Sequence, residues 1–88
     1  MTYAIEISEK LAKAFDKLRK RDRPQAEILK RKIREILEGP LRFKPLTGNM
    51  AGVRRARVRN FVLTFEIIEQ KKSVRLLDYD HHDNIYKK

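Results

Sequence analysis

Apolar and polar positions alternate over the first residues of the chain and then change to a helical spacing. Tyr3, Ile5 and Ile7 alternate with polar or small residues, which predicts a short strand with one apolar face. Ser8 stands where a helix N-cap is expected, because its hydroxyl can accept an otherwise unpaired backbone N–H. A helix is predicted from there through Arg19, and its apolar stripe follows the i, i+3, i+4, i+7 spacing: Leu11, Ala14, Phe15 and Leu18.

A second amphipathic helix is predicted to follow a polar turn at residues 19–23. Pro24 suits the first turn of a helix, and Gly39-Pro40 suits its end. The apolar stripe between them consists of Ala26, Leu29, Ile33, Ile36 and Leu37. Because the connection is short, the two helices should form an antiparallel hairpin. Residues 41–52 show no clear period and are expected to form a loop.

Two strands are predicted on either side of Arg59-Asn60, at Val53 to Val58 and Phe61 to Ile68. A two-residue hairpin turn fixes their register. The predicted pairs are Val58 with Phe61, Arg57 with Val62, Ala56 with Leu63 and Arg55 with Thr64. Asn tolerates a positive φ, whereas Arg is less usual in such a turn. The inward face should hold Ala56, Val58, Phe61, Leu63, Phe65 and Ile67, and the outward face should hold Arg55, Arg57, Val62, Thr64 and Glu66.

A last strand is predicted at Val74 to Tyr79, before a polar tail at residues 80–88. The expected fold is therefore a single α+β domain over residues 1–88, in the order β-α-α-β-β-β. Its sheet should be mainly antiparallel, with the helical hairpin packed on one face.

The composition excludes several classes of protein. The 88 residues include no cysteine, which rules out a disulfide framework, a thiol nucleophile and a thiolate zinc site. No signal peptide is visible, and the longest uncharged apolar stretch, residues 61–65, is too short to cross a bilayer. No phosphate-binding glycine loop or serine-hydrolase motif occurs. We therefore expect a cytoplasmic protein with no membrane partner and no small-molecule cofactor.

The charge balance changes this picture most. Lys and Arg number 22 against 12 acids, a formal net charge of +10. Such a field attracts polyanions, either nucleic acid or an acidic protein partner. Charge-rich surfaces also suit proteins from hot environments, but that explains the number of charges and not their imbalance.

A run of arginines carries the first candidate chemistry. Arg55 and Arg57 lie two apart on a predicted strand, so both leave the same face, and Arg54 and Arg59 flank them. Guanidinium groups bind phosphate oxygens in a bidentate manner. The alternative is a solvated strand face with cross-strand ion pairs, for example to Glu66.

The tail offers titratable groups. Asp80-His81-His82-Asp83 resembles a metal site, but adjacent side chains of an extended segment point opposite ways and no distant ligands complete a shell. A histidine near the arginines is more useful as a proton donor or acceptor, although a surface histidine without a role is an open alternative. Tyr86 could stack on a nucleobase or close the edge of the core.

The order of these segments resembles the RelE toxin family and its ParE relatives. The matching segments are Leu46-Thr47-Gly48, Gly52-Val53-Arg54-Arg55-Ala56-Arg57-Val58, Phe61-Val62-Leu63-Thr64-Phe65-Glu66-Ile67 and a terminal His-x-x-x-Ile-Tyr. The resemblance implies a toxin neutralised by a cognate antitoxin protein. It also implies a ribosome-dependent endoribonuclease that cuts mRNA without a metal, through attack of a 2′-hydroxyl that leaves a cyclic phosphate.

The resemblance also assigns roles to residues. Arg55 and Arg57 match the family's paired basic positions that contact phosphate, Tyr86 matches a terminal tyrosine near the scissile bond, and His82 falls where many members have arginine. The expected catalytic residues are Arg55, Arg57, His82 and Tyr86. The expected RNA-binding residues are Lys44, Arg54, Arg59 and His81.

The chain departs from the family pattern at two places. Val62 replaces an arginine, and Arg59-Asn60 replaces a turn Gly-Asp. Two alternatives to the nuclease therefore stay open. One is a ParE-like toxin that inhibits DNA gyrase by binding, and the other is a weak or inactive RNA-binding relative.

Overall fold

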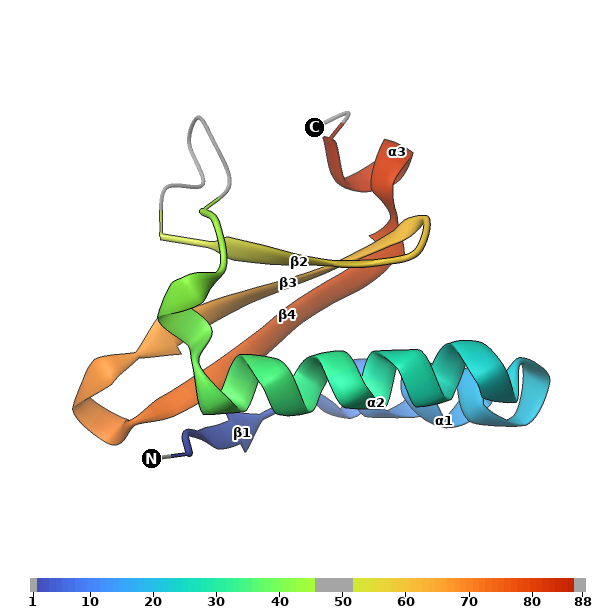
Figure 1. Ribbon diagram of the computed structural model, residues 1–88. Helices are drawn as coiled ribbons and strands as arrows, with labels where there is room; N and C mark the ends of the chain where they lie inside the picture. Colours follow the sequence, from blue (N-terminus) through green and yellow to red (C-terminus); the bar gives the residue numbers. More distant parts are fainter. Residues whose placement is uncertain (1, 46–51, 87–88) are drawn as a thin grey trace.

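The computed structural model describes residues 2–45 and 52–86, apart from the side chain of Tyr86. A helical hairpin covers one face of a four-stranded sheet, and a short C-terminal helix stands on the other side (Figure 1). The elements are β1 (Ala4–Glu6), α1 (Glu9–Arg21), α2 (Arg23–Glu38), the 3₁₀ helix η1 (Pro40–Arg42), β2 (Arg54–Val58), β3 (Phe61–Ile68), the 3₁₀ helix η3 (Glu69–Lys71), β4 (Ser73–His81) and α3 (His82–Tyr86). No helix within the described ranges is long and apolar enough to span a bilayer.

The sheet has the strand order β1-β4-β3-β2. β1 pairs with β4 in parallel, and the other two pairings are antiparallel. The expected α+β fold with a mainly antiparallel sheet is confirmed. The predicted segment Leu46-Thr47-Gly48 lies outside the described residues.

Local capping explains where the helices begin and end. The Ser8 side chain accepts a hydrogen bond from the backbone N–H of Leu11 at 3.1 Å, as predicted for an N-cap. Asp22 caps both helices, because its N–H donates to the Leu18 carbonyl at 2.7 Å and its carboxylate accepts from the Gln25 N–H at 3.2 Å. The turn between the helices is therefore this single residue, shorter than the polar turn expected from the sequence.

The predicted register of the β2–β3 hairpin is confirmed at every pair from Val58↔Phe61 to Arg55↔Thr64. Arg59, rather than Asn60, adopts the positive φ in the turn, at 58°. On the other side of β3 the register shifts between Thr64 and Phe65, which leaves Leu77 of β4 without a partner in the ladder.

The core lies between the hairpin and the sheet. Its buried residues come from α1, α2, β2, β3 and β4: Leu11, Leu18, Leu29, Ile36, Ala56, Val58, Leu63, Phe65, Val74 and Leu76. Ala14 is exposed, contrary to the predicted stripe, as are Ile5 and Ile7, at 44% and 38%. Ile5 belongs to a short edge strand that has a neighbour, β4, on one side only, and Ile7 belongs to the link that follows this strand.

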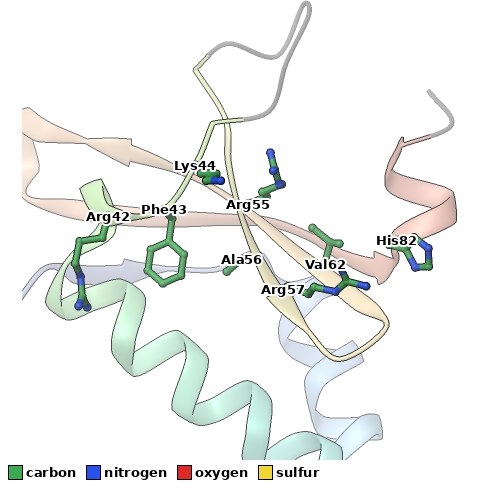
Figure 2. Close-up of a pocket in the computed structure, with 8 residues that line it drawn as sticks. All are labelled: Arg42, Phe43, Lys44, Arg55, Ala56, Arg57, Val62 and His82. Atoms are coloured by element: carbon green, nitrogen blue, oxygen red, sulfur yellow. The ribbon is translucent and has the colours of Figure 1, made fainter.

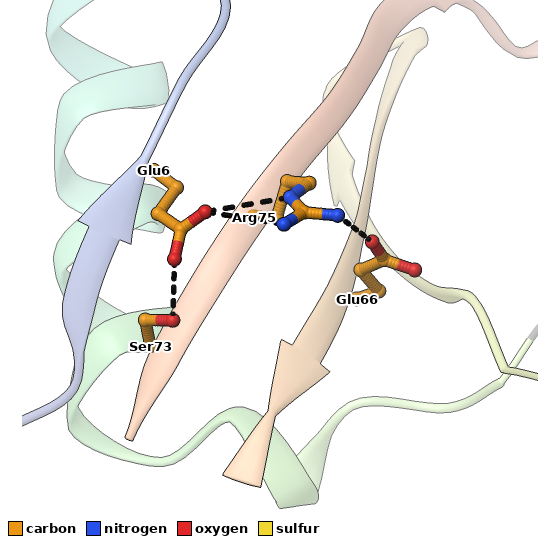
Figure 3. Close-up of polar contacts among 4 residues, drawn as sticks. All are labelled: Glu6, Glu66, Ser73 and Arg75. Atoms are coloured by element: carbon orange, nitrogen blue, oxygen red, sulfur yellow. Dashed lines mark hydrogen bonds and ion pairs between the residues drawn. The ribbon is translucent and has the colours of Figure 1, made fainter. Parts of the chain in front are cut away.

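Polar side chains attach β1 to the rest of the sheet (Figure 3). Arg75 of β4 donates to Glu66 at 2.9 Å and contacts Glu6 at 3.4 Å, and the Ser73 hydroxyl donates to Glu6 at 2.8 Å. The Ser73 hydrogen bond, assisted by Arg75, lowers the pKa of Glu6 below its ordinary value. The ionised Glu6 carboxylate therefore contributes to stability above the ordinary carboxyl pKa, and this contribution is lost as the pH falls through the lowered pKa of Glu6.

A buried glutamine connects α2 to the sheet. The Gln25 side-chain amide donates to the Val58 carbonyl at 3.3 Å and to the Tyr79 hydroxyl at 2.8 Å. We expect Gln25→Ala to lower the free energy of unfolding by about 1–3 kcal/mol, because both acceptors lose a buried partner. Urea denaturation measures the change, with exposed Gln70→Ala as the control. Equal midpoints for the two variants would contradict this prediction.

Candidate functional site

A hollow of about 350 Å³ opens on the sheet face opposite the helical hairpin (Figure 2). One wall comes from the segment that leads into β2, and the other comes from the start of α3. The lining residues are Arg42, Phe43, Lys44, Arg55, Ala56, Arg57, Val62 and His82.

The floor of the hollow is apolar. Val62 lies opposite Arg57 in the β2–β3 ladder and opposite Asp80 in the β3–β4 ladder, and it is only 3% exposed. Thr64 is buried beside it. The prediction that Val62 and Thr64 lie on the outward face is confirmed, but their burial was not predicted. The walls beside them come from segments whose sequences show no periodicity.

The first wall is an extension of the sheet. The Lys44 carbonyl accepts from the Arg55 N–H at 3.0 Å, and Pro45 forms a bridge with Arg54. Arg54 donates to the Phe43 carbonyl at 2.6 Å, and the Arg55 guanidinium donates to the Pro45 carbonyl at 3.0 Å. Arg54 thus holds the wall in place and does not line the hollow.

The second wall is held by the β2–β3 turn. The Asn60 carbonyl accepts from the His82 backbone N–H at 3.0 Å and lies 3.2 Å from His82 Nδ1. A carbonyl oxygen can only accept, so this contact is a hydrogen bond in the tautomer with a proton on Nδ1. His82 Nε2 lies 3.0 Å from the Asp83 carboxylate, so an imidazolium would donate from both nitrogens.

His81 faces the side of the sheet that the helical hairpin covers. It pairs with Phe61 across the ladder, and their rings meet edge-on with centroids 5.7 Å apart. The His81 and His82 rings are nevertheless only 4.6 Å apart, because the chain turns into α3 between them. The prediction that these adjacent side chains diverge is therefore wrong. His81, His82 and Asp83 each place one potential ligand atom within 4.8 Å of the others, which is close enough for a metal ion.

The structure brings together half of the predicted site residues. Lys44, Arg55, Arg57 and His82 line one hollow. Arg59, like Arg54 and His81, does not line it, but its carbonyl accepts from Arg57 Nε at 3.1 Å. The side chain of Tyr86 lies outside the described part of the chain. Arg42 and Phe43 could not be identified from the sequence, because residues 41–52 show no periodicity.

The chemistry of the lining favours an anion. Four of the lining side chains are basic, and none of the lining residues is acidic: the basic residues are Arg42, Lys44, Arg55 and Arg57. Figure 2 shows the Arg57 side chain extending toward His82, with Val62 beside it. Guanidinium groups above a buried apolar floor can bind phosphate oxygens, and the imidazole can donate or accept a proton.

Comparisons with known proteins agree on one group of relatives. Residues 5–86 match the family described as the ParE toxin of the type II toxin–antitoxin system, parDE. An uncharacterised protein of Methanosarcina mazei is 45% identical over 96% of this chain and 99% of its own length. A Methanocaldococcus jannaschii protein named "Putative toxin RelE4" is 40% identical over 98% of this chain and 93% of its own.

Solved structures share the fold. The toxin–antitoxin complex RelBE2 of Mycobacterium tuberculosis includes a chain 25% identical to this one, with a TM-score of 0.74 over 93% of this chain and 100% of that chain. A variant of the Escherichia coli toxin RelE in the free state gives a TM-score of 0.75 at 24% identity, over 96% of this chain and 87% of that chain.

The burial of Val62 yields a prediction about the family arginine. We expect Val62→Arg to lower the free energy of unfolding by about 2 kcal/mol, because a guanidinium must enter a dry position among other cations. Chemical denaturation measures the change, and Val53→Arg, at a half-buried position before β2, is the control. Unchanged stability of Val62→Arg would show that the floor opens to accept the longer side chain.

Proposed function

Because the chain belongs to the RelE/ParE superfamily of toxins from type II toxin–antitoxin systems, we propose that it is the toxin that cuts mRNA on the ribosome. The single observation that carries this proposal is that Lys44, Arg55, Arg57 and His82 line one hollow, none of whose lining residues is acidic. Cleavage of RNA needs cations for the phosphate and a group that transfers a proton, and this hollow offers both.

In the proposed reaction the 2′-hydroxyl of one nucleotide attacks the adjacent phosphorus. The bond from the 2′ oxygen to phosphorus forms, the bond to the 5′ oxygen breaks, and a 2′,3′-cyclic phosphate remains. Arg55 and Arg57 stabilise the charge on the phosphorane. His82 donates a proton from Nε2 to the leaving 5′ oxygen, the 2′-hydroxyl proton passes to water, and Tyr86 lies beside the scissile bond.

A gyrase-inhibiting toxin is the second candidate. The matching family is described as the ParE toxin, and Val62 removes an arginine from the floor where a nuclease of this family would use one. Such a toxin would bind gyrase and leave mRNA intact. A third possibility is a relative that binds RNA without cutting it, for which the same cations would suffice.

The proposed partner is an antitoxin, and an apolar track fits it. Three shallow hollows adjoin along the hairpin, because Phe15 lines two of them and Ile7 links the second to a third that reaches Leu77. Lys30, Arg19 and Arg75 lie along the same hollows, and Arg19 and Arg75 already form ion pairs with Asp16 and with Glu6 and Glu66, respectively. An amphipathic segment with acidic residues would bury its apolar side there and pair its charges with these cations.

The division of work between binding and proton transfer can be tested by substitution. We expect His82→Ala to slow single-turnover cleavage of ribosome-bound mRNA by about 10²–10⁴-fold with ribosome binding nearly intact. Arg57→Ala should weaken both, and Arg31→Ala, exposed on α2, serves as the matched arginine control. Wild-type protein that is stripped of metal by a chelator and then returned to ribosome buffer should still cleave.

Three outcomes would count against this mechanism. Cleavage by His82→Ala at the wild-type rate would transfer the proton role to Lys44 or Tyr86. Loss of cleavage by the metal-stripped protein, with recovery when metal is added back, would point to a metal at His81, His82 and Asp83. Absence of cleavage by the wild type would leave gyrase inhibition or RNA binding as the function.

The antitoxin surface has its own test. Expression of the chain alone should stop growth, and the antitoxin from the neighbouring reading frame should restore it. We expect Ile7→Glu to escape neutralisation, since a charge in the apolar track should cost about 2 kcal/mol of binding. Leu41→Glu, at an exposed apolar position outside the track, should stay neutralised. Equal neutralisation of both variants would exclude the track as the binding surface.

A further inference from the structure

The turn between β2 and β3 is held in a conformation that its sequence does not favour. Arg59 has a φ of 58°, a region that glycine enters freely and other residues enter at a cost. Lys72, at the end of η3, is the second non-glycine residue with a positive φ within the described ranges, at 49°. The two lie at opposite ends of β3, so only one of them is near the hollow.

The carbonyl groups of this turn hold two side chains of the hollow. The Arg59 carbonyl accepts from Arg57 Nε at 3.1 Å. The Asn60 carbonyl accepts from the His82 N–H at 3.0 Å and from Nδ1 at 3.2 Å. The orientation of the Arg59 carbonyl therefore affects where the Arg57 guanidinium lies, and the orientation of the Asn60 carbonyl affects where His82 lies.

We propose that the Arg59-Asn60 turn is the positioning element of the active site, an inference that rests on the proposed function. The direction of a carbonyl follows from the φ and ψ angles on either side of it. A turn with a negative φ at position 59 would redirect both carbonyls, and Arg57 and His82 would each lose a partner. A displacement of about 1 Å in a catalytic group costs on the order of a hundredfold in rate.

Two substitutions at position 59 separate the conformation from the charge. Arg59→Gly and Arg59→Val both remove the guanidinium, but only glycine keeps a positive φ without strain. We expect single-turnover cleavage of ribosome-bound mRNA by Arg59→Val to be slower than by Arg59→Gly, on the order of a hundredfold. Ribosome binding should be equal, because the two variants carry the same charge.

The same pair of substitutions at Lys72 controls for general loss of stability. Lys72→Val should unfold at a lower temperature than Lys72→Gly, for the same reason of backbone strain. Its cleavage rate should nevertheless equal that of Lys72→Gly, because Lys72 lies at the far end of the sheet. Its side chain pairs there with Glu69 and lies over the Tyr3 ring, and its carbonyl accepts from the Ala4 N–H. A rate ratio at Lys72 as large as that at Arg59 would overturn the proposal.

A spectroscopic measurement makes the test independent of catalysis. The ¹⁵N shifts of the His82 imidazole should report a protonated Nδ1 in the wild type and in Arg59→Gly. In Arg59→Val the Nδ1 shift should differ, because Nδ1 loses its Asn60 acceptor. If Arg59→Val does not fold, Arg59→Ala replaces it, since its Cβ meets the same restriction.

The outcomes separate the two ideas. If the wild type does not cleave mRNA, the proposed function fails and the His82 shifts alone decide whether the turn positions this side chain. If the Gly and Val variants have identical His82 shifts and identical cleavage rates, the turn does not position the site and the inference is wrong.

Discussion

The two-residue connection between β2 and β3 is the constraint on which the rest of the site depends. It fixes the register of the hairpin, so that Arg57 lies beside Val62 and Arg55 beside Thr64. The Asn60 carbonyl of this connection also bonds His82, and so joins the C-terminal wall to the sheet. A single turn thereby determines the positions of Arg55 and Arg57 and of the His82 imidazole.

The two faces of the sheet have different roles. The helical hairpin buries one face, where Gln25 provides the polar link between α2, β2 and β4. The other face keeps an apolar floor at Val62 but is walled by short segments that contribute cations. A rigid sheet beneath a charged hollow is well suited to hold an anion, because the arginine side chains begin from fixed backbone positions.

Local patterns predicted most of the fold, and contacts between distant segments decided the rest. Helix starts and the hairpin register followed from Ser8 and Arg59-Asn60, where the determining interactions span a few residues. The burial of Val62 and the meeting of Asn60 with His82 join segments about twenty residues apart, and no periodicity records such contacts. The polar sequence of residues 80–83 predicts an extended segment. In the structure the Asp80 carboxylate accepts from the His81 N–H and from the Asn84 side chain, which supports the turn into α3.

In the proposed function the cationic hollow cuts mRNA rather than only binding a partner. Mapping the 5′ ends of mRNA from cells that express the chain tests it most directly. We expect new, discrete ends inside translated reading frames, and we expect them to be absent when translation initiation is blocked or when Arg57 is replaced by Ala. Intact messages in cells whose growth has stopped, together with a loss of DNA supercoiling, would contradict the account and support gyrase as the target.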